Sequence, residues 1–386
     1  MNFKKGILFL HRWLGFISGL VVFIVSITGC IFCFQDEIQD AVHAWRKVTP
    51  VEKPYIAPSM LMKAALSKYP GATSNYMYYF GADRPAMIIA SVPKVGFTDI
   101  YLNPYTGQFL HAEGAKENFF TVVEYIHLYL LLPDKIGSMV VGISAIAFVF
   151  IMVMGIILWW PKRKSDRKRS FTIKWNGRWR RVNYDLHNVL GFYAAAIGII
   201  LAITGLGVDF EWMDKAIYKT ANLGKTYTNE TQIFKSDSVF KASINALPAV
   251  DQAFLSTKRL SPKAEMFLIY TDDSKAGIVG VTAYANSLRY GNNDSYMFDK
   301  YSGKILHQLP NSQKSLGLKL NDLNYDIHVG QALGLFGKIM AFLASLICAS
   351  LPVTGFIIWW GKRNKSKSKK VKMVVHRRLH KQTQLK

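Results

Sequence analysis

The sequence predicts an α-helical membrane protein with four transmembrane helices, an internal two-fold repeat and two α+β domains outside the membrane. Two observations predict this fold class. The segment at 10–16 (LHRWLGF) recurs as 186–192 (LHNVLGF), and each copy opens an apolar run that reaches Ile-Thr-Gly. Four apolar runs are also long enough to cross a bilayer, which takes about 20 residues. Repetition of this kind indicates two homologous halves.

The four apolar runs are expected to be the transmembrane helices. They cover about 13–34, 138–160, 188–208 and 335–360, and none carries Lys, Asp or Glu at its centre. The first run follows two lysines and contains Ile-Thr-Gly-Cys at 27–30, a pattern typical of a cleaved lipoprotein signal. Because Ile-Thr-Gly recurs at 203–205, where no signal peptide is needed, we interpret the first run as a retained helix.

The basic residues predict the orientation of the chain. The segments 1–12, 161–181 and 361–386 hold 24 Lys and Arg with one acid, Asp166, and the rest of the chain is balanced. By the positive-inside rule, both termini and the middle loop are cytoplasmic. Basic clusters beside membrane helices favour the headgroups of the lipid bilayer as their partner and argue against nucleic acid.

These observations divide the chain into alternating membrane and aqueous segments. The outer segments carry no cysteine, so they fold without disulfides. The expected order is helix 1–34, outer domain 35–136, helix 137–160, cytoplasmic loop 161–186, helix 187–209, outer domain 210–333, helix 334–360 and cytoplasmic tail 361–386.

The first outer domain is predicted to be a small α+β unit. An amphipathic continuation of the first helix covers 36–47, and proline-rich sequence then separates it from a helix over 59–69. Strand-like runs follow, and a turn of composition Asn-Pro-Tyr-Thr-Gly precedes the last of them. These runs cover 74–80, 86–91, 98–102 and 108–111.

The second outer domain repeats this plan. A helix is expected over 238–247, followed by strand-like runs over 265–270, 277–283, 295–299 and 304–307. Both domains close on Tyr-(Thr/Ser)-Gly-x-(Phe/Ile)-Leu-His. Short helices over 117–132 and 322–333 then deliver one histidine each to the membrane edge. Cys30 and Cys33 resemble a redox pair, but neither has a counterpart in the second half, and we interpret them as small apolar residues.

Four histidines stand at the ends of the four transmembrane helices: His11, His127, His187 and His328. An imidazole at the membrane is costly without a partner, and haem iron binds a neutral imidazole nitrogen in an apolar, helical setting. The chain enters the bilayer from one side at His11 and His187, and from the other after His127 and His328. The topology therefore predicts two bis-histidine haem groups, with His11 and His187 holding the inner iron and His127 and His328 the outer.

Other residues are candidates for contact with the haem or a substrate. Gly15 and Gly191 lie one helical turn beyond His11 and His187, where a glycine lets a flat macrocycle approach. Arg12 pairs either with a haem propionate or with a lipid phosphate. His111 and His307 share a repeat position; we interpret them as structural residues at a strand end, with substrate contact as the alternative. The sequence identifies no catalytic side chain.

The histidine-opened helices, the Trp-Trp-x-(Lys/Arg) exits at 159–162 and 359–362 and the Tyr-x-Gly-x-x-Leu turns resemble the PepSY-associated transmembrane family. That family includes inner-membrane ferric-siderophore reductases of the FoxB type. The resemblance implies four transmembrane helices, two periplasmic PepSY-like domains and two haem b groups. It also implies a bacterial inner-membrane oxidoreductase that reduces a ferric siderophore in the periplasm and releases Fe(II).

The electron donor and two competing functions stay open. No strand–Gly-x-Gly-x-x-Gly–helix unit appears in the sequence, so a separate donor is expected, either a cytoplasmic reductase or a quinol. A membrane-anchored regulator would use the outer domains for binding and the helices only as anchors. A siderophore or haem permease would use the internal repeat as a transport path.

Overall fold

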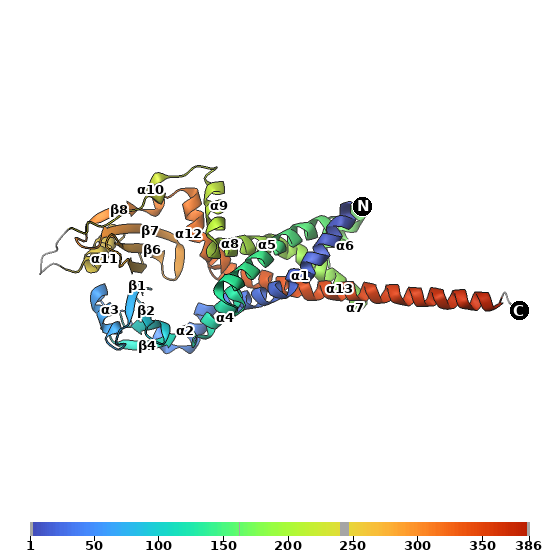
Figure 1. Ribbon diagram of the computed structural model, residues 1–386, viewed down its shortest axis with the longest axis horizontal. Helices are drawn as coiled ribbons and strands as arrows, with labels where there is room; N and C mark the ends of the chain where they lie inside the picture. The colour runs from blue at the N-terminus through green and yellow to red at the C-terminus, as the bar shows by residue number, and fades with distance from the viewer. Residues whose placement is uncertain (1–2, 162, 240–246, 384–386) are drawn as a thin grey trace. The chain divides into compact units, whose positions relative to one another are not determined.

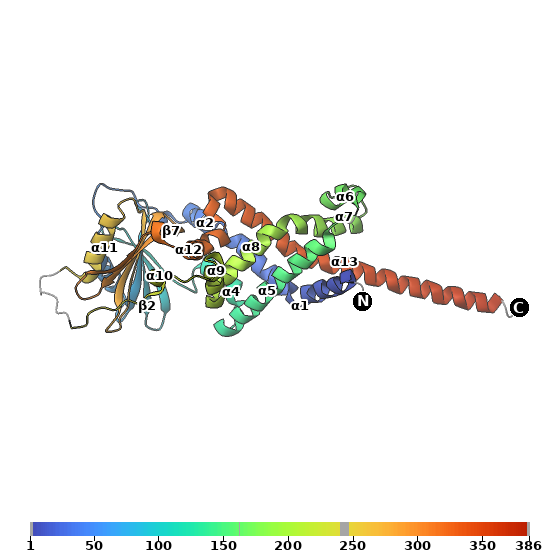
Figure 2. The same ribbon diagram turned by 90° about the horizontal axis from the view of Figure 1, so that it is seen from above.

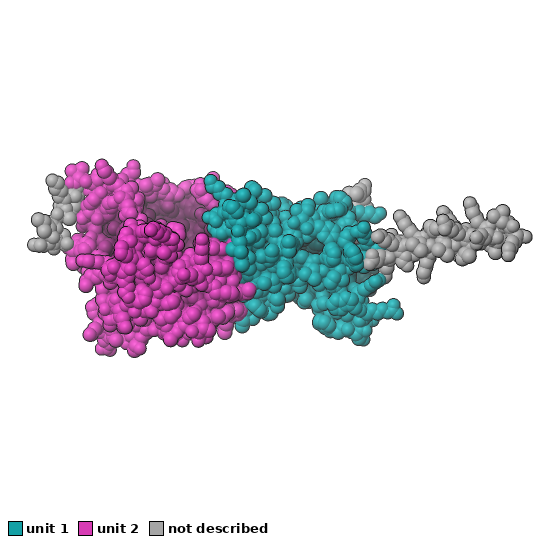
Figure 3. Space-filling model, turned by 60° about the horizontal axis from the view of Figure 1, so that its bottom comes forward, with its two compact units in different colours: residues 1–30, 126–203, 339–386 teal, residues 31–125, 204–338 magenta. Residues whose placement is uncertain are grey.

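The computed structural model of the protein describes residues 3–161, 163–239 and 247–383, with side chains described to residue 363. The chain forms two compact units, shown in Figure 3 in teal and magenta. Unit 1 comprises residues 1–30, 126–203 and 339–386, and unit 2 comprises residues 31–125 and 204–338. Unit 1 holds most of the long apolar helices and unit 2 holds the β-sheet.

Four helices of the described residues are long and apolar enough to cross a membrane, as the sequence predicts. They are α1 (Phe3–Phe32), α5 (Asp134–Trp159), the span Trp179–Asp209 that ends in α8 (Gly191–Asp209), and the span Gln331–Arg363, most of which belongs to α13 (Gly334–Thr383). Figure 1 labels these helices along the chain. Each span begins before the start of the apolar run from which it was predicted, because helical geometry continues through the polar ends of these runs.

Short helices form within the segment 161–186, for which the sequence predicts a cytoplasmic loop. Between α5 and α8 lie η2 (Lys164–Asp166), α6 (Arg167–Phe171) and α7 (Trp179–Asp185). A π-helical turn, η3 (Leu186–Leu190), joins α7 to α8. Such turns widen a helix by one residue and are frequent at functional sites.

Small residues and aromatic pairs pack the helices of unit 1. Ala194 and Ala195 of α8 contact Met152 of α5 and Cys348 of α13 in a buried cluster. Small residues let membrane helices approach closely. Two aromatic pairs connect the helices further. The ring of Phe192 stacks on Trp159 at 3.8 Å between centroids, and Phe16 meets Trp359 edge-on at 5.0 Å, so α8 packs on α5 and α1 on α13.

Unit 2 contains one antiparallel sheet with strand order β4-β3-β2-β1-β5-β6-β7-β8. The sequence predicts two separate outer domains, yet their strands share this sheet because Tyr76–Tyr79 of β1 pair with residues 267–270 of β5. The strands are β1 (Thr73–Tyr79), β2 (Ala86–Val92), β3 (Gly96–Leu102), β4 (Phe109–Gly114), β5 (Met266–Thr271), β6 (Ile278–Asn286), β7 (Arg289–Asp299) and β8 (Ile305–Leu309).

Two helices cover one face of this sheet. Side chains of α3 (Pro58–Leu66) and α11 (Ala249–Leu260) form a buried core with alternate residues of the strands, among them Ile88, Ile100 and Leu102. Figure 2 shows α11 lying against the strands. The helix predicted over 238–247 falls largely on 240–246, outside the described residues. Helix α11 lies just after it and was not predicted.

The opposite face of the sheet carries the intervening residues, such as Asp99 and Tyr101, because successive side chains of a strand alternate between faces. The remaining helices of this unit are α2 (Gln35–Val42), η1 (Ala44–Arg46), α9 (Glu211–Ala221), α10 (Thr228–Thr231), α12 (Leu316–His328), which packs along β7, η4 (Asn311–Gln313) and η5 (Gln331–Leu333). Helix α4 (Phe119–Tyr129) begins in unit 2 and ends in unit 1.

Candidate functional site

His11 on α1 is held by helix α5. Its Nδ1 lies 3.1 Å from the main-chain oxygen of Ile151. A carbonyl oxygen only accepts, so Nδ1 carries the proton and Nε2 keeps its lone pair. A Cβ atom placed on Gly155 would lie 3.5 Å from Cε1 of His11, so the imidazole packs directly over the glycine backbone.

His187 is held in the same manner by α13. It lies in the π-helical turn η3, and its Nδ1 is 2.9 Å from the hydroxyl oxygen of Thr354. That hydroxyl donates its own proton to the carbonyl of Ser350 at 2.9 Å, so it accepts from Nδ1. A Cβ on Gly355 would come within 3.1 Å of Cε1 of His187. The ring is therefore fixed as the Nδ1–H tautomer, which leaves Nε2 available to a metal ion.

The rings of His11 and His187 lie together in unit 1. Their centroids are 6.4 Å apart and their planes are nearly perpendicular, at 88°. A metal–imidazole bond is about 2 Å long, so two imidazoles on opposite sides of one metal ion have ring centres roughly 6 Å apart. The spacing and the donor set of two neutral imidazoles therefore fit axial ligation of one haem iron.

His127, at the end of α4, is anchored to α1. Its Nδ1 lies 3.0 Å from the hydroxyl oxygen of Thr28, which donates to the carbonyl of Ile24 at 2.9 Å. A Cβ on Gly29 would lie 3.3 Å from Cε1 of His127. The hydrogen-bond direction again places the proton on Nδ1.

His328, the last residue of α12, follows the same pattern within unit 2. Its Nδ1 lies 3.3 Å from the hydroxyl oxygen of Thr204 on α8. A Cβ on Gly205 would lie 2.7 Å from Cε1 of His328. Because His127 belongs to unit 1 and His328 to unit 2, the pairing of these two histidines stays a prediction.

Helix α1 gives the distance in unit 1 between His11 and the residue that binds His127. His11 and Thr28, the partner of His127, lie 17 residues apart on this helix. At 1.5 Å per residue, they are separated by about 25 Å along the helix axis. This distance is shorter than the full length of the helix, because neither His11 nor Thr28 lies at an end of α1.

The partners of the histidines were not identified from the sequence. Each ring packs on a glycine of a facing helix, and in three cases the residue before that glycine is the threonine that binds Nδ1. The dipeptides are Thr28-Gly29, Thr204-Gly205, Thr354-Gly355 and, beside His11, Met154-Gly155. The recurrence of Ile-Thr-Gly in the repeat was a signal in the sequence that these positions matter. Which histidine packs on which of these glycines, however, depends on how the helices pack in the fold.

The other predicted haem contacts have different surroundings. A Cβ on Gly15 would have no atom within 4 Å, whereas one on Gly191 would lie 3.4 Å from Leu351. Gly15 therefore borders open space and Gly191 packs against α13. Arg12 is exposed, with its guanidinium 5.9 Å from the ring centroids of Phe9 and Trp13. Both interpretations of Arg12 remain.

His111 and His307 occupy matching strand positions and stack on aromatic rings. His111 lies on Trp45 at 4.5 Å and 20°, and its Nε2 is 3.8 Å from a carboxylate oxygen of Glu113. His307 lies on Phe234 at 4.5 Å and 15°, with Nε2 buried and without a hydrogen-bond partner among the described residues. The stacking accords with a structural role, and substrate contact stays a prediction.

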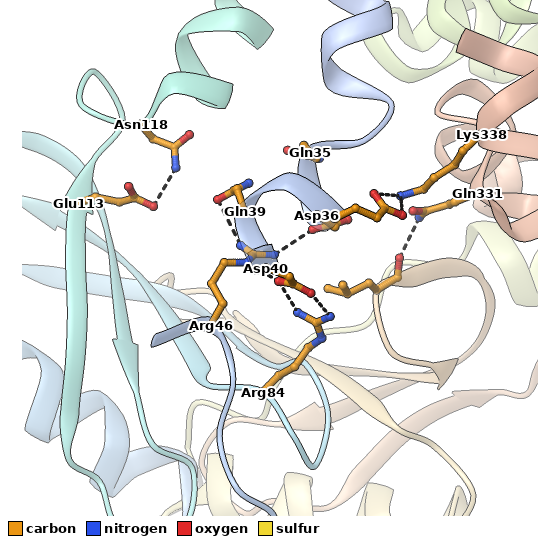
Figure 4. Close-up of polar contacts among 12 residues, drawn as sticks. Gln35, Asp36, Gln39, Asp40, Arg46, Arg84, Glu113, Asn118, Gln331 and Lys338 are labelled. Atoms are coloured by element: carbon orange, nitrogen blue, oxygen red, sulfur yellow. Dashed lines mark hydrogen bonds and ion pairs between the residues drawn. The ribbon is translucent and has the colours of Figure 1, made fainter. Parts of the chain in front are cut away.

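A cavity of about 160 Å³ lies within unit 2, on the face of the sheet opposite α3 and α11. An ion-pair cluster forms one wall (Figure 4). Arg46 donates to Asp36 at 3.0 Å and to Asp40 at 2.7 Å, and Arg84 donates to Asp40 at 2.6 Å. Burial by itself raises the pKa of Asp40, but the hydrogen bonds from Arg84 and Arg46 outweigh it and hold this pKa below its ordinary value.

No group of three or more His, Cys, Asp and Glu side chains suited to a metal ion occurs among the described residues.

In comparisons with known proteins, the family model described as PepSY-associated TM region matches residues 8–362. No curated protein matches the chain.

Proposed function

The chain belongs to the PepSY-associated transmembrane family, and from that premise we propose that it is a di-haem oxidoreductase that carries electrons across a bacterial inner membrane. The acceptor is a ferric siderophore on the periplasmic side, whose reduction releases Fe(II). When bound, haem iron supplies one-electron exchange between Fe(III) and Fe(II).

The observation that carries this proposal is the arrangement of His11 and His187. Their ring centres are 6.4 Å apart, and both Nδ1 atoms are hydrogen bonded. Each ring is thus fixed in the tautomer that presents Nε2 as a ligand. Neutral imidazoles in an apolar helix bundle, in a protein whose described residues form no cluster of three or more metal-binding side chains, favour haem over a hard or soft metal ion.

His127 and His328 would hold the second group. Each is anchored through Nδ1 by a threonine of a membrane helix, Thr28 and Thr204. Two histidine ligands on each iron would leave neither iron open to substrate. The acceptor is therefore bound by the outer domains and the donor, a cytoplasmic reductase or a quinol, by the opposite side.

The basic segments support the proposed orientation. By the positive-inside rule, the clusters at 1–12, 161–181 and 361–386 favour a cytoplasmic position for both termini. Unit 2, which contains the sheet and the cavity, then lies in the periplasm.

An absorption spectrum of the purified protein tests the proposal. We expect a reduced-minus-oxidised difference spectrum of b type with two haem groups per chain, and about one in either His187→Ala or His328→Ala. His43→Ala, which changes a histidine outside the four, is the matched control and is expected to keep both. A colourless protein would leave the anchored regulator, and siderophore uptake that survives loss of all four histidines would favour the permease.

A further inference from the structure

The cavity of unit 2 is large enough for a small chemical group but not for a whole siderophore. Its volume is about 160 Å³. A cavity of roughly this size holds one benzene molecule, whereas drug-sized ligands need about 300 Å³ or more. The cavity therefore accommodates one end or limb of a larger ligand.

Aromatic side chains form much of the wall. Trp45 and Tyr101 lie 4.4 Å apart between ring centroids, and Tyr290 and Tyr325 meet edge-on at 5.3 Å. The faces of aromatic rings attract cations, by about 0.5–2 kcal/mol for each well-placed contact. The wall therefore suits a positively charged group with an apolar body.

The cations of the cavity are already neutralised. Arg46 and Arg84, which both line it, are bound by Asp36 and Asp40 through the ion pairs of Figure 4. Two guanidinium groups are matched by two carboxylates, so this wall adds no net charge. An anionic ligand would have to displace one of these carboxylates.

Two further carboxylates, Asp99 and Glu124, line the cavity without a compensating charge. Among the described residues, neither accepts a hydrogen bond or pairs with a cation. Asp99 stands directly opposite Glu113 in the β3–β4 ladder, a like-charge pairing that destabilises a sheet. Glu113 accepts from Asn118 at 2.7 Å. Burial, Glu113 and Glu124 together raise the pKa of Asp99 to about 6.

The cavity is close in the fold to one of the proposed haem ligands. Tyr325, which lines it, precedes His328 by three residues on α12, so the two lie on one face of that helix about one turn apart. Gln35 donates to the hydroxyl of Tyr325 at 3.3 Å, which fixes the ring at the cavity wall. Tyr325 therefore connects the cavity wall to the helical turn that carries His328.

We propose that this cavity binds an organic cation, the ammonium-bearing limb of the electron acceptor, between the carboxylates of Asp99 and Glu124 and the surrounding aromatic rings. The assignment of the ligand as the electron acceptor rests on the proposed function. The binding of an ammonium group does not, because it follows from the cavity alone.

Titration of the detergent-purified full-length protein with three probes of one shape tests the proposal. Benzylammonium, benzyl alcohol and benzoate differ mainly in charge, and their binding is measured by saturation-transfer NMR and by the fluorescence of the tryptophans, one of which is Trp45. At pH 8 we expect benzylammonium to bind at least about tenfold more tightly than benzyl alcohol, as hydrogen bonds to charged groups imply, and benzoate not to bind.

Variants separate the cavity from unspecific attraction. Asp99→Asn and Glu124→Gln are each expected to weaken benzylammonium binding about tenfold, whereas Glu211→Gln, at an exposed carboxylate paired with Lys215, is expected to change nothing. Equal binding of the three probes, or unchanged binding in both cavity variants, overturns the proposal. The titration needs no haem, so a colourless protein that still binds benzylammonium would reject the proposed function and leave the cation site standing.

Discussion

Thr354 accepts the Nδ1 proton of His187 at 2.9 Å, whereas Met154, at the matching position beside His11, has no hydroxyl to offer. His11 uses the main-chain oxygen of Ile151 instead, at 3.1 Å. The two candidate ligands of the inner haem therefore differ in their outer hydrogen bond. A side-chain partner can be removed by mutation without breaking a helix, and a main-chain partner cannot.

Replacement of Thr354 by Val tests whether this hydrogen bond positions His187. Loss of an outer partner of a metal-bound histidine typically lowers affinity by about 10–100-fold. We therefore expect a lower content of the inner haem in Thr354→Val and a more positive midpoint potential, since the imidazole becomes a weaker donor. Potentiometric titration followed by absorption measures both. Thr172→Val, whose hydroxyl donates to the carbonyl of Lys168, is the control. Equal potentials in the two variants would refute a positioning role.

The glycines beneath the four imidazoles give a graded prediction. A Cβ would lie 2.7 Å from the ring of His328 at Gly205, 3.1 Å from that of His187 at Gly355, 3.3 Å from that of His127 at Gly29 and 3.5 Å from that of His11 at Gly155. Contacts under about 3 Å force a ring to move, whereas those near 3.5 Å are ordinary packing.

We therefore expect Gly205→Ala to lose the most haem and Gly155→Ala the least, with the other two between them. Haem content per chain, from the pyridine haemochrome spectrum, measures the order. The four variants control for one another, because each adds the same methyl group to a membrane helix. An equal loss in all four would show that helix packing, and not the position of the imidazoles, limits haem binding.

The sequence predicted the four histidines but not what holds them. His11 and His187 were recognisable because the repeat places both at the start of an apolar run. Thr28 and Thr354 were not, because a threonine in an apolar helix usually binds its own main chain, as both also do here. Which helix faces which histidine depends on packing between segments more than 90 residues apart, and no local pattern records it.

For the outer segments, strands were easier to predict than their assembly. In the runs around Tyr76 and Ile88, buried and more exposed side chains alternate, and turn residues bound both runs. The predicted bounds of these two strands therefore lie within two residues of the observed bounds. The pairing of Tyr76 with Tyr270 was not foreseen, since edge-to-edge pairing of two strands depends on backbone groups that every sequence carries. The π-helical turn at His187 has no composition signal either.

The ion-pair cluster of unit 2 is expected to contribute to stability. Asp40 accepts from both Arg46 and Arg84, and its side chain is 16% exposed. Asp40→Asn removes the carboxylate that binds Arg84 and leaves Arg46 with Asp36 alone, so we expect a loss of about 2 kcal/mol in the free energy of unfolding. Because the pKa of Asp40 is lowered by folding, this contribution is complete at neutral pH and is lost only as the pH falls below the ordinary Asp range.

Thermal unfolding of the detergent-purified protein, followed by circular dichroism, measures the effect. Lys215→Ala is the matched control, because it breaks an exposed pair with Glu211 and is expected to change the melting temperature little. Similar losses in the two variants would show that the Asp40 cluster acts as a surface ion pair.

Asp99 gives a prediction of the opposite sign. Burial, Glu113 on β4 and Glu124 on α4 raise its pKa from 3.8 to about 6 in the folded protein. Between these two values the folded state binds more protons than the unfolded state, so stability falls as the pH rises through this window and is constant above it. Asp99→Asn removes the charge and keeps the shape of the side chain. The variant is therefore expected to melt at the same temperature as the wild type near pH 4 and at a higher temperature at pH 7.5.

Benzylammonium extends this prediction to the ligand. A bound cation compensates the Asp99 carboxylate, so at pH 7.5 it is expected to raise the melting temperature of the wild type towards that of Asp99→Asn, and to leave the variant nearly unchanged. Melting curves at several pH values with and without the probe measure both effects. A difference between wild type and variant that stays constant from pH 4 to 7.5 would contradict the strained carboxylate. If Asp99→Asn is more stable than the wild type but binds benzylammonium equally well, the cation binds elsewhere. The lower stability that the Asp99 carboxylate causes would then not serve ligand binding.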